Sequence, residues 1–227
     1  TVERNQPLVS KVTLVGSIQN KDLAEPYLNK FNSDIIAEAA PRNTAAAIAF
    51  AAFHADPDDI LIVTPSDHLI EGEEDYQQAI NQGIVFAQEG YIATFGIIPT
   101  RPETGYGYIE SGKIEYPNFS FLQKVTQFKE KPNLEKAKEF LAQGNFYWNS
   151  GMFIWSAKAI VEAFKNHSAD LHEIFNKGMQ SFNSANEKSF VDQAYQACPN
   201  ISVDYAILEK AQNVYVLPAT FDWNDLG

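Results

Sequence analysis

The sequence predicts an α/β fold built on a mostly parallel, mixed sheet that is flanked by helices. Two observations carry this prediction. Short runs of apolar and β-branched residues recur along the first hundred positions, and stretches with one apolar face at helical spacing stand between them. Strands and helices that alternate at this rhythm form βαβ crossovers, which produce parallel sheets.

The first half of the chain supplies most of these elements. Residues 1–10 read as the end of a helix and a connection around Pro7. Ile60–Val63 is the clearest strand, a continuous apolar run of the kind expected when both faces are covered. Asn43 and Thr44 offer cap oxygens to a following helix. The expected strands are 12–15, 35–38, 60–63 and 91–96, and the expected helices are the run after Asn43 and 75–88.

The second half changes in character. Residues 108–110 and 121–129 are extended and are expected to pair as a hairpin-like excursion. An aromatic strand over 146–155, interrupted at 149–151, reads as core rather than as a platform for stacking bases. The remaining expected elements are helices over 133–143, 157–197 with a polar break at 183–186, and 202–211, and a strand over 214–217. We interpret residues 1–227 as one domain with a helical insert toward its C-terminal side.

Charge and composition exclude several classes of protein. Seventeen basic and 29 acidic side chains give a formal net charge of −12, which argues against a nucleic-acid platform but not against a small phosphate ligand. The longest apolar run, 45–53, has nine residues, whereas a membrane span needs about 20. No secretory signal opens the chain. Cys198 is the one cysteine and fits a reducing compartment, so we expect a globular, cytoplasmic protein without a membrane partner.

Two aspartates are candidates for a metal site. In open parallel sheets ligands collect at the carboxyl ends of strands, and Asp67 follows the clearest strand directly. A carboxylate there suits Mg²⁺, which prefers one or two carboxylates together with phosphate oxygens. Asp225 also follows a strand and could supply the second carboxylate. The alternatives are a helix cap or an Asx-turn at Asp67 and a plain turn at Asp225. His68, a lone histidine, reads as structural.

Glu130 and Lys131 lie side by side at the end of an extended segment. Consecutive strand residues point to opposite faces, so both side chains reach one ligand only if the strand ends there, and Pro132 favours such an end. A carboxylate that accepts sugar hydroxyls beside an ammonium for a phosphate would suit a sugar phosphate. A solvated ion pair is the alternative.

Two further segments could contact a ligand. The glycines of residues 104–107, Thr-Gly-Tyr-Gly, could let the backbone approach a ligand closely, although a plain loop is the default. Arg42, Asn43 and Thr44 bring a cation and two hydrogen-bonding side chains to a helix N-terminus, where anions are favoured. Helix capping alone would also account for Asn43 and Thr44.

These pieces occur in an order that resembles the sugar-phosphate nucleotidylyltransferases, and most closely their long-type mannose-1-phosphate guanylyltransferase branch. The resemblance runs from residue 38 to the last residue. The matching segments are EAAPRNTAAAI (38–48), TPSDHLI (64–70), TRPETGYGYIE (100–110), FKEKP (128–132), WNSGMF (148–153), SVDYAILEK (202–210) and WNDLG (223–227).

The resemblance implies a Rossmann-like catalytic domain of the nucleotide-diphospho-sugar transferase type and a role for each matching residue. Asp67 and Asp225 correspond to the paired carboxylates that hold catalytic Mg²⁺. The sugar side is implied for Glu130, Lys131, Asn149 and Gly107, with Lys131 on the sugar phosphate as a catalytic residue. The nucleotide side is implied for Arg42, Asn43, Thr44, Ser66 and Asp67.

The implied reaction is guanylyl transfer from GTP to mannose 1-phosphate, which gives GDP-mannose for polysaccharide biosynthesis and releases pyrophosphate. A homodimer is compatible with the resemblance. The alternatives are a related enzyme for another base or hexose, and a non-catalytic nucleotide-sugar binder. Two departures from the family stand out: Pro41 lies next to Arg42, and no strand with a glycine-rich triphosphate loop precedes residue 12. We therefore expect a domain truncated at its N-terminus, without a C-terminal β-helix or cupin-type extension.

Overall fold

A computed structural model describes residues 2–113 and 122–227, and these residues form two compact units. The sheet unit consists of Ile60–Ala159 and Ala211–Gly227. The helical unit consists of Val2–Asp59 and Ile160–Lys210. Each unit therefore combines two stretches that are far apart in the sequence.

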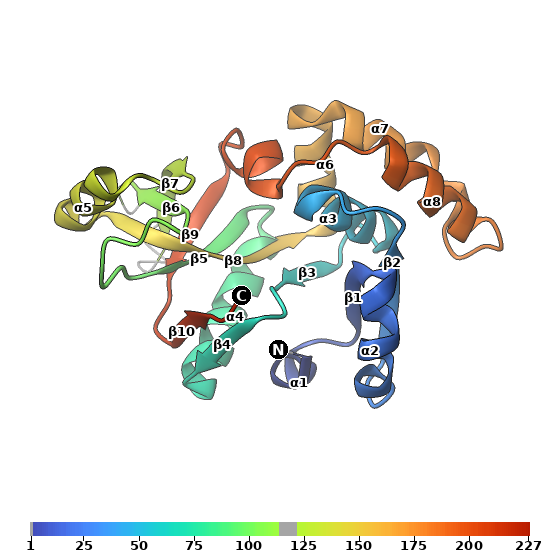
Figure 1. Cartoon of the computed structure of the whole chain (residues 1–227), viewed down its shortest axis with the longest axis horizontal. Coiled ribbons are helices and arrows are strands. Elements are labelled where there is room, and N and C mark those ends of the chain that lie inside the picture. Colours follow the sequence, from blue (N-terminus) through green and yellow to red (C-terminus); the bar gives the residue numbers. More distant parts are fainter. Residues whose placement is uncertain (1, 114–121) are drawn as a thin grey trace. The chain divides into compact units, whose positions relative to one another are not determined.

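A mixed sheet with the strand order β3–β8–β5–β9–β7–β6 dominates the sheet unit, and β8 also pairs with β6 (Figure 1). A small antiparallel ribbon of β4 and β10 stands apart from it. The elements of the unit are β3 (Ile60–Val63), β4 (His68–Glu71), α4 (Glu73–Gln88), β5 (Ile92–Ile97), β6 (Tyr108–Ser111), β7 (Gln123–Lys129), α5 (Leu134–Gln143), β8 (Phe146–Ser156), β9 (Val214–Pro218) and β10 (Asp222–Asp225).

Helix α4 covers the middle of this sheet. Its inward residues lie at helical spacing, and all of them are buried, as is every residue of β5. At Gly83 a Cβ would lie 2.7 Å from Ile154 Cδ1, so the helix approaches β8 closely because that position has no side chain. The inward residues are Tyr76, Ala79, Ile80, Gly83, Phe86 and Ala87.

The helical unit combines a parallel pair of strands with a group of helices. β1 and β2 pair in parallel, and the intervening α2 provides the crossover. The strands and α-helices are α1 (Val2–Asn5), β1 (Val12–Ser17), α2 (Ile18–Leu28), β2 (Ser33–Glu38), α3 (Asn43–His54), α6 (Ala157–His167, most of it in this unit), α7 (Ala169–Lys177) and α8 (Glu187–Ala197). Two short 3-10 helices, η1 (Gln6–Leu8) and η2 (Met179–Ser181), and one short π-helix, η3 (Asp204–Leu208), complete the list.

Aromatic side chains form the core of the helical unit. Phe50 of α3 lies 6.0 Å from Phe175 of α7 and 5.5 Å from Phe182, measured between ring centroids. Tyr195 of α8 packs against both Phe50 and Phe175. These tilted and edge-on arrangements are the ones that aromatic pairs prefer.

Among the described helices, none is long and apolar enough to cross a bilayer.

The α/β class is confirmed, and most predicted elements are present near their predicted positions. The hairpin of β6 and β7 pairs antiparallel as expected, although the start of its second strand, residue 121, lies outside the described residues. The aromatic strand β8 is continuous through residues 149–151, although Gly151 has a left-handed φ of +69°. α2, β4 and β10 were not predicted, and the helical run after 157 breaks at Ser168 as well as near 183–186.

The pairing of the strands is less parallel than their alternation with helices predicts. Parallel pairing links β1 with β2 and β5 with β9. β8 runs antiparallel to β3, β5 and β6, because it returns across the sheet as one long strand. Ile60–Val63 pairs only with β8 among the described strands, and its residues are half-buried rather than covered on both faces.

Candidate functional site

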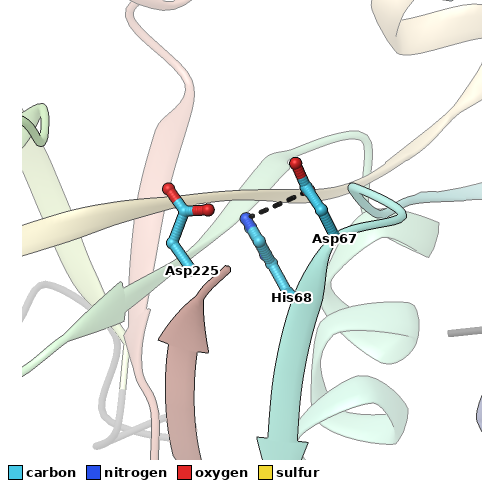
Figure 2. A group of neighbouring side chains, drawn as sticks. All are labelled: Asp67, His68 and Asp225. Atoms are coloured by element: carbon cyan, nitrogen blue, oxygen red, sulfur yellow. Dashed lines mark ion pairs between the residues drawn. The ribbon is translucent and has the colours of Figure 1, made fainter. Parts of the chain in front are cut away.

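The β4–β10 ribbon brings Asp67 and Asp225 together. Asp67 lies in the turn between β3 and β4, and Asp225 is the last residue of β10. The antiparallel register sets Asp225 opposite His68, the neighbour of Asp67, and the backbone N–H of Leu226 donates to the carbonyl of Asp67 at 3.2 Å. Two carboxylates that lie 158 positions apart in the sequence therefore meet at one end of the ribbon (Figure 2).

His68 lies between these carboxylates (Figure 2). Its Nε2 is 3.9 Å from Asp67 Oδ1, and its Nδ1 accepts a hydrogen bond of 3.0 Å from the indole N–H of Trp223. Burial lowers the pKa of the imidazole, and the charges of Asp225 and Asp67 oppose that shift without cancelling it. The neutral ring is therefore favoured over the charged one.

The Asp67–His68–Asp225 cluster fits a divalent cation in its donor chemistry. One potential ligand atom from each residue lies within 4.8 Å of the others. Two oxygens on one Mg²⁺ can be at most about 4 Å apart, twice the Mg–O distance of about 2.1 Å, so a small side-chain rotation would bring both carboxylates to one ion. Asp67 is also exposed (56% of its side chain), which leaves access for a ligand.

A second cluster, the Gly107 cluster, consists of Gly107, Glu130, Lys131 and Asn149. β7 ends at Lys129, and Lys131 adopts the left-handed φ of +39° directly before Pro132. The strand therefore ends where Pro132 was expected to end it. As a result, Lys131 Nζ lies 3.9 Å from Glu130 Oε1, on the same side, instead of on the opposite face.

Gly107 and Asn149 complete this cluster. A Cβ at Gly107 would lie 2.8 Å from Glu130 Oε2 and 3.5 Å from Asn149 Cβ, so a side chain here would displace the carboxylate. The backbone N–H of Asn149 donates to the carbonyl of Gly107 at 2.8 Å, which fixes the two segments to each other. Gly107 thus brings the backbone close to a carboxylate, and the close approach of this loop to a ligand stays a prediction.

The Glu103 carboxylate binds the first half of the 104–107 loop. Its Oε1 accepts the backbone N–H groups of Thr104 and Gly105 at 2.9 and 3.0 Å. The bond from Gly105, followed by that from the Arg101 side chain, lowers the pKa of Glu103. These two backbone donors are therefore engaged within the loop, which they stiffen next to the Gly107 cluster.

Tyr106 connects the two clusters of the sheet unit. It directly precedes Gly107, and its ring lies 5.4 Å from that of Trp223, edge-on. Trp223 in turn donates to His68. A Cβ at Gly151, two residues after Asn149, would lie 3.4 Å from Cγ of Pro65 in the turn that carries Asp67. Packing contacts thus link the carboxylates to the Gly107 cluster.

The residues expected on the nucleotide side lie in both units. Ser66 is exposed in the turn beside Asp67. In the helical unit, Arg42 donates through Nε and Nη2 to the carbonyls of Tyr195 and Gln196, at 2.6 and 2.8 Å. It thereby satisfies carbonyls in the last turn of α8.

The side chains of Asn43 and Thr44 also accept hydrogen bonds from backbone N–H groups. Asn43 has a left-handed φ of +63°, and its Oδ1 accepts the backbone N–H of Thr44 at 2.8 Å. Thr44 Oγ1 accepts the backbone N–H of Val203 at 2.9 Å. All three side chains of this segment therefore help to fix its shape.

The sequence did not identify His68, a member of the Asp67–His68–Asp225 cluster, or its partner Trp223 as functional residues. The sequence predicts a structural role for His68 and shows Trp223 only as part of the 223–227 motif. The available signal was that both residues lie within two positions of a candidate aspartate. What was missing was the β4–β10 pairing, which places them side by side.

The family model for nucleotidyl transferases ("Nucleotidyl transferase") matches residues 11–227. The mannose-1-phosphate guanylyltransferase of Escherichia coli K12 is 40% identical over 209 residues, an alignment that covers 88% of this chain and 43% of the relative. The chain thus spans less than half the length of this curated relative.

Two solved structures superpose on almost the whole chain. A Thermus thermophilus protein described as mannose-1-phosphate geranyltransferase superposes with a TM-score of 0.87 at 30% identity, over 99% of this chain and 64% of the other. A Helicobacter pylori protein described as mannose-6-phosphate isomerase gives 0.83 at 32%, over 98% and 88%. From the match to residues 11–227, the chain belongs to the nucleotidyl transferase family.

Proposed function

We propose that the protein is part of a mannose-1-phosphate guanylyltransferase, which transfers a guanylyl group from GTP to mannose 1-phosphate. The observation that carries this proposal is the convergence of two clusters in the sheet unit: the carboxylates Asp67 and Asp225, and the Gly107 cluster with its paired Glu130 and Lys131. Relatives about 40% identical that bear this enzyme's name support the choice of substrates.

In the proposed reaction a phosphate oxygen of mannose 1-phosphate attacks the α-phosphorus of GTP. The bond from that phosphorus to the bridging oxygen breaks, and pyrophosphate leaves with its electron pair. The attacking phosphate is already ionised, so no general base is needed. Catalysis then depends on aligning two anions and neutralising their charge.

Each cluster has a part in that alignment. Glu130 accepts hydrogen bonds from sugar hydroxyls, beside Gly107 and Asn149, and Lys131 donates to the sugar phosphate. The left-handed backbone of Lys131 is unfavourable for a residue with a side chain, and such conformations gather at functional sites. This strain supports a functional role for the turn.

Asp67 and Asp225 would hold the Mg²⁺ that the reaction uses. When bound, the ion supplies positive charge at phosphate oxygens. Tyr106, which precedes Gly107, packs against Trp223 on the strand that carries Asp225. This packing would fix the position of the ion relative to the Gly107 cluster. Ser66, beside Asp67, belongs to the nucleotide side of this proposal.

Arg42, Asn43 and Thr44 serve the nucleotide side in a different way. Their side chains are engaged with backbone groups at Tyr195, Gln196, Thr44 and Val203. We infer that any role on the nucleotide side is exerted through the shape of the segment that these hydrogen bonds fix. Cys198 is buried, burial raises its pKa to about 11, and a thiol of this kind fits the reducing cytoplasm that we propose as the compartment.

The test is pyrophosphate release from the full-length protein over a matrix of nucleotides and sugar phosphates with Mg²⁺. We expect GTP with mannose 1-phosphate to be the best pair. Turnover of UTP with glucose 1-phosphate, and none with GTP and mannose 1-phosphate, would instead assign another member of the family. Tight calorimetric binding of GDP-mannose without any turnover would indicate a non-catalytic binder.

A further inference from the structure

The hydrogen bond from Trp223 determines which nitrogen of His68 carries its proton. An indole N–H can only donate, so the His68 Nδ1 that accepts it at 3.0 Å has no proton. A neutral imidazole then carries its proton on the other nitrogen, Nε2. The geometry of one hydrogen bond thus assigns the tautomer.

The protonated nitrogen is the one that faces the carboxylates. Nε2 lies 3.9 Å from Asp67 Oδ1, and Figure 2 shows the ring between Asp67 and Asp225. A ring nitrogen can coordinate a metal only through a free lone pair, which Nε2–H lacks. His68 therefore offers this cluster a hydrogen-bond donor and no ligand atom.

We propose that His68 is a positioning residue, which Trp223 locks as the Nε2–H tautomer so that it steadies the two carboxylates and stays out of the metal's coordination. The ion is then left with oxygen ligands. Oxygen ligands suit Mg²⁺ and Mn²⁺, whereas an added imidazole would favour Zn²⁺. This role presupposes the metal site of the proposed function.

Two features of the sheet unit support this role. Two carboxylates in one place repel each other, and a donor between them lowers that repulsion before an ion arrives. Trp223 is also held in place, because β10 pairs with β4 and the ring of Tyr106 packs edge-on at 5.4 Å. The His68 and Trp223 rings are themselves edge-on, with centroids 5.1 Å apart.

The tautomer can be read directly by NMR on the wild-type full-length protein at neutral pH, without metal or substrate. A two-bond ¹H–¹⁵N correlation shows which imidazole nitrogen carries the proton, and the signals of His68 are those lost in His68→Gln. We expect the proton on Nε2. A proton on Nδ1 would overturn the proposal. Neither result depends on which substrates the enzyme uses.

Metal selectivity provides the second test. Trp223→Phe keeps a ring but removes the N–H, which frees Nδ1 to take the proton and Nε2 to bind metal. We expect the affinity for Zn²⁺ relative to Mn²⁺, measured by calorimetry with the ions alone, to rise about tenfold or more. Adding His68→Gln to this variant should reverse the rise.

A matched control is Trp155→Phe, in the same unit. Trp155 is fully buried, and its indole N–H has no hydrogen-bond partner among the described residues, so its loss removes no donor from a metal site. The Zn²⁺ to Mn²⁺ ratio should stay at the wild-type value in this control. A wild-type ratio in Trp223→Phe as well would overturn the proposal.

Discussion

The two units of the molecule use their motif residues differently. In the sheet unit, the side chains of Asp67 and Lys131 are 56% and 65% exposed, and their charged atoms lie near other ionisable side chains. In the helical unit, the guanidinium of Arg42 and the hydroxyl of Thr44 are bonded to backbone groups of residues 195, 196 and 203. We therefore expect similar polar residues to serve chemistry in the sheet unit and architecture in the helical unit.

This difference shows how to distinguish the two roles. A charged side chain whose donors already bond to backbone carbonyls stabilises the fold, whereas one that meets other ionisable groups near the surface is available to a ligand. Substitutions in the sheet unit should therefore affect turnover more than stability. Substitutions in the helical unit should affect stability first.

The largest expected effect is at the carboxylates. Asp225→Asn keeps the shape of the side chain but removes the charge that would hold a divalent ion, so Mg²⁺-dependent release of pyrophosphate should fall more than about 100-fold. Asp222→Asn is the matched control, since Asp222 is exposed on the same strand and lies outside the cluster. A similar fall in both variants would contradict a specific role for Asp225.

Lys131→Ala comes next. Loss of a charge-assisted hydrogen bond to the sugar phosphate should raise the KM for mannose 1-phosphate about 10- to 100-fold. The KM for GTP should change little. Lys136→Ala removes an exposed lysine that pairs with Glu139 on α5, and it should leave both KM values near wild type. An equal rise in both KM values for Lys131→Ala would argue against a contact with the sugar phosphate.

In the helical unit, Arg42→Lys keeps the charge but cannot reproduce two hydrogen bonds from one planar group. We expect the free energy of unfolding to fall by about 1–3 kcal/mol, measured by urea denaturation, because carbonyls in the last turn of α8 lose their donors. A raised KM for GTP with unchanged stability would instead assign the guanidinium to the nucleotide.

The smallest effects should come from two buried tyrosines, one in each unit. Tyr108 donates to the carbonyl of Glu103 at 2.8 Å, whereas the hydroxyl of Tyr195 has no hydrogen-bond partner among the described residues. Tyr108→Phe should cost about 0.5–1.5 kcal/mol of stability, and Tyr195→Phe should cost nothing or stabilise slightly. Thermal denaturation of both variants measures the contrast, and equal losses would contradict it.

The sequence was sufficient where local rules decide the structure. The helix over 75–88 followed from helical spacing, and the helix over 133–143 begins at a capping residue, since Asn133 accepts the N–H of Lys136 at 2.9 Å. Pro132 also predicted correctly that the strand ends near Glu130 and Lys131. In each case the determining residues are close together in the chain.

The sequence was insufficient where distant segments decide. β4 and β10 are four-residue strands whose pairing joins residues 68–71 to 222–225, and such short runs carry little periodicity. α2 has almost no amphipathic pattern and contains Pro26, which normally argues against a helix. The carbonyls that hold Arg42 lie 153 and 154 positions away, so no local motif reveals that contact.

The central claim is that Asp67 and Asp225 form one metal site. A calorimetric titration of Mn²⁺, which shares the preference of Mg²⁺ for oxygen ligands, into the wild type, Asp67→Asn and Asp225→Asn tests it most directly. We predict one ion per chain in the wild type and a loss of at least about tenfold in affinity in each variant. Wild-type affinity in either variant would show that the two carboxylates do not share an ion.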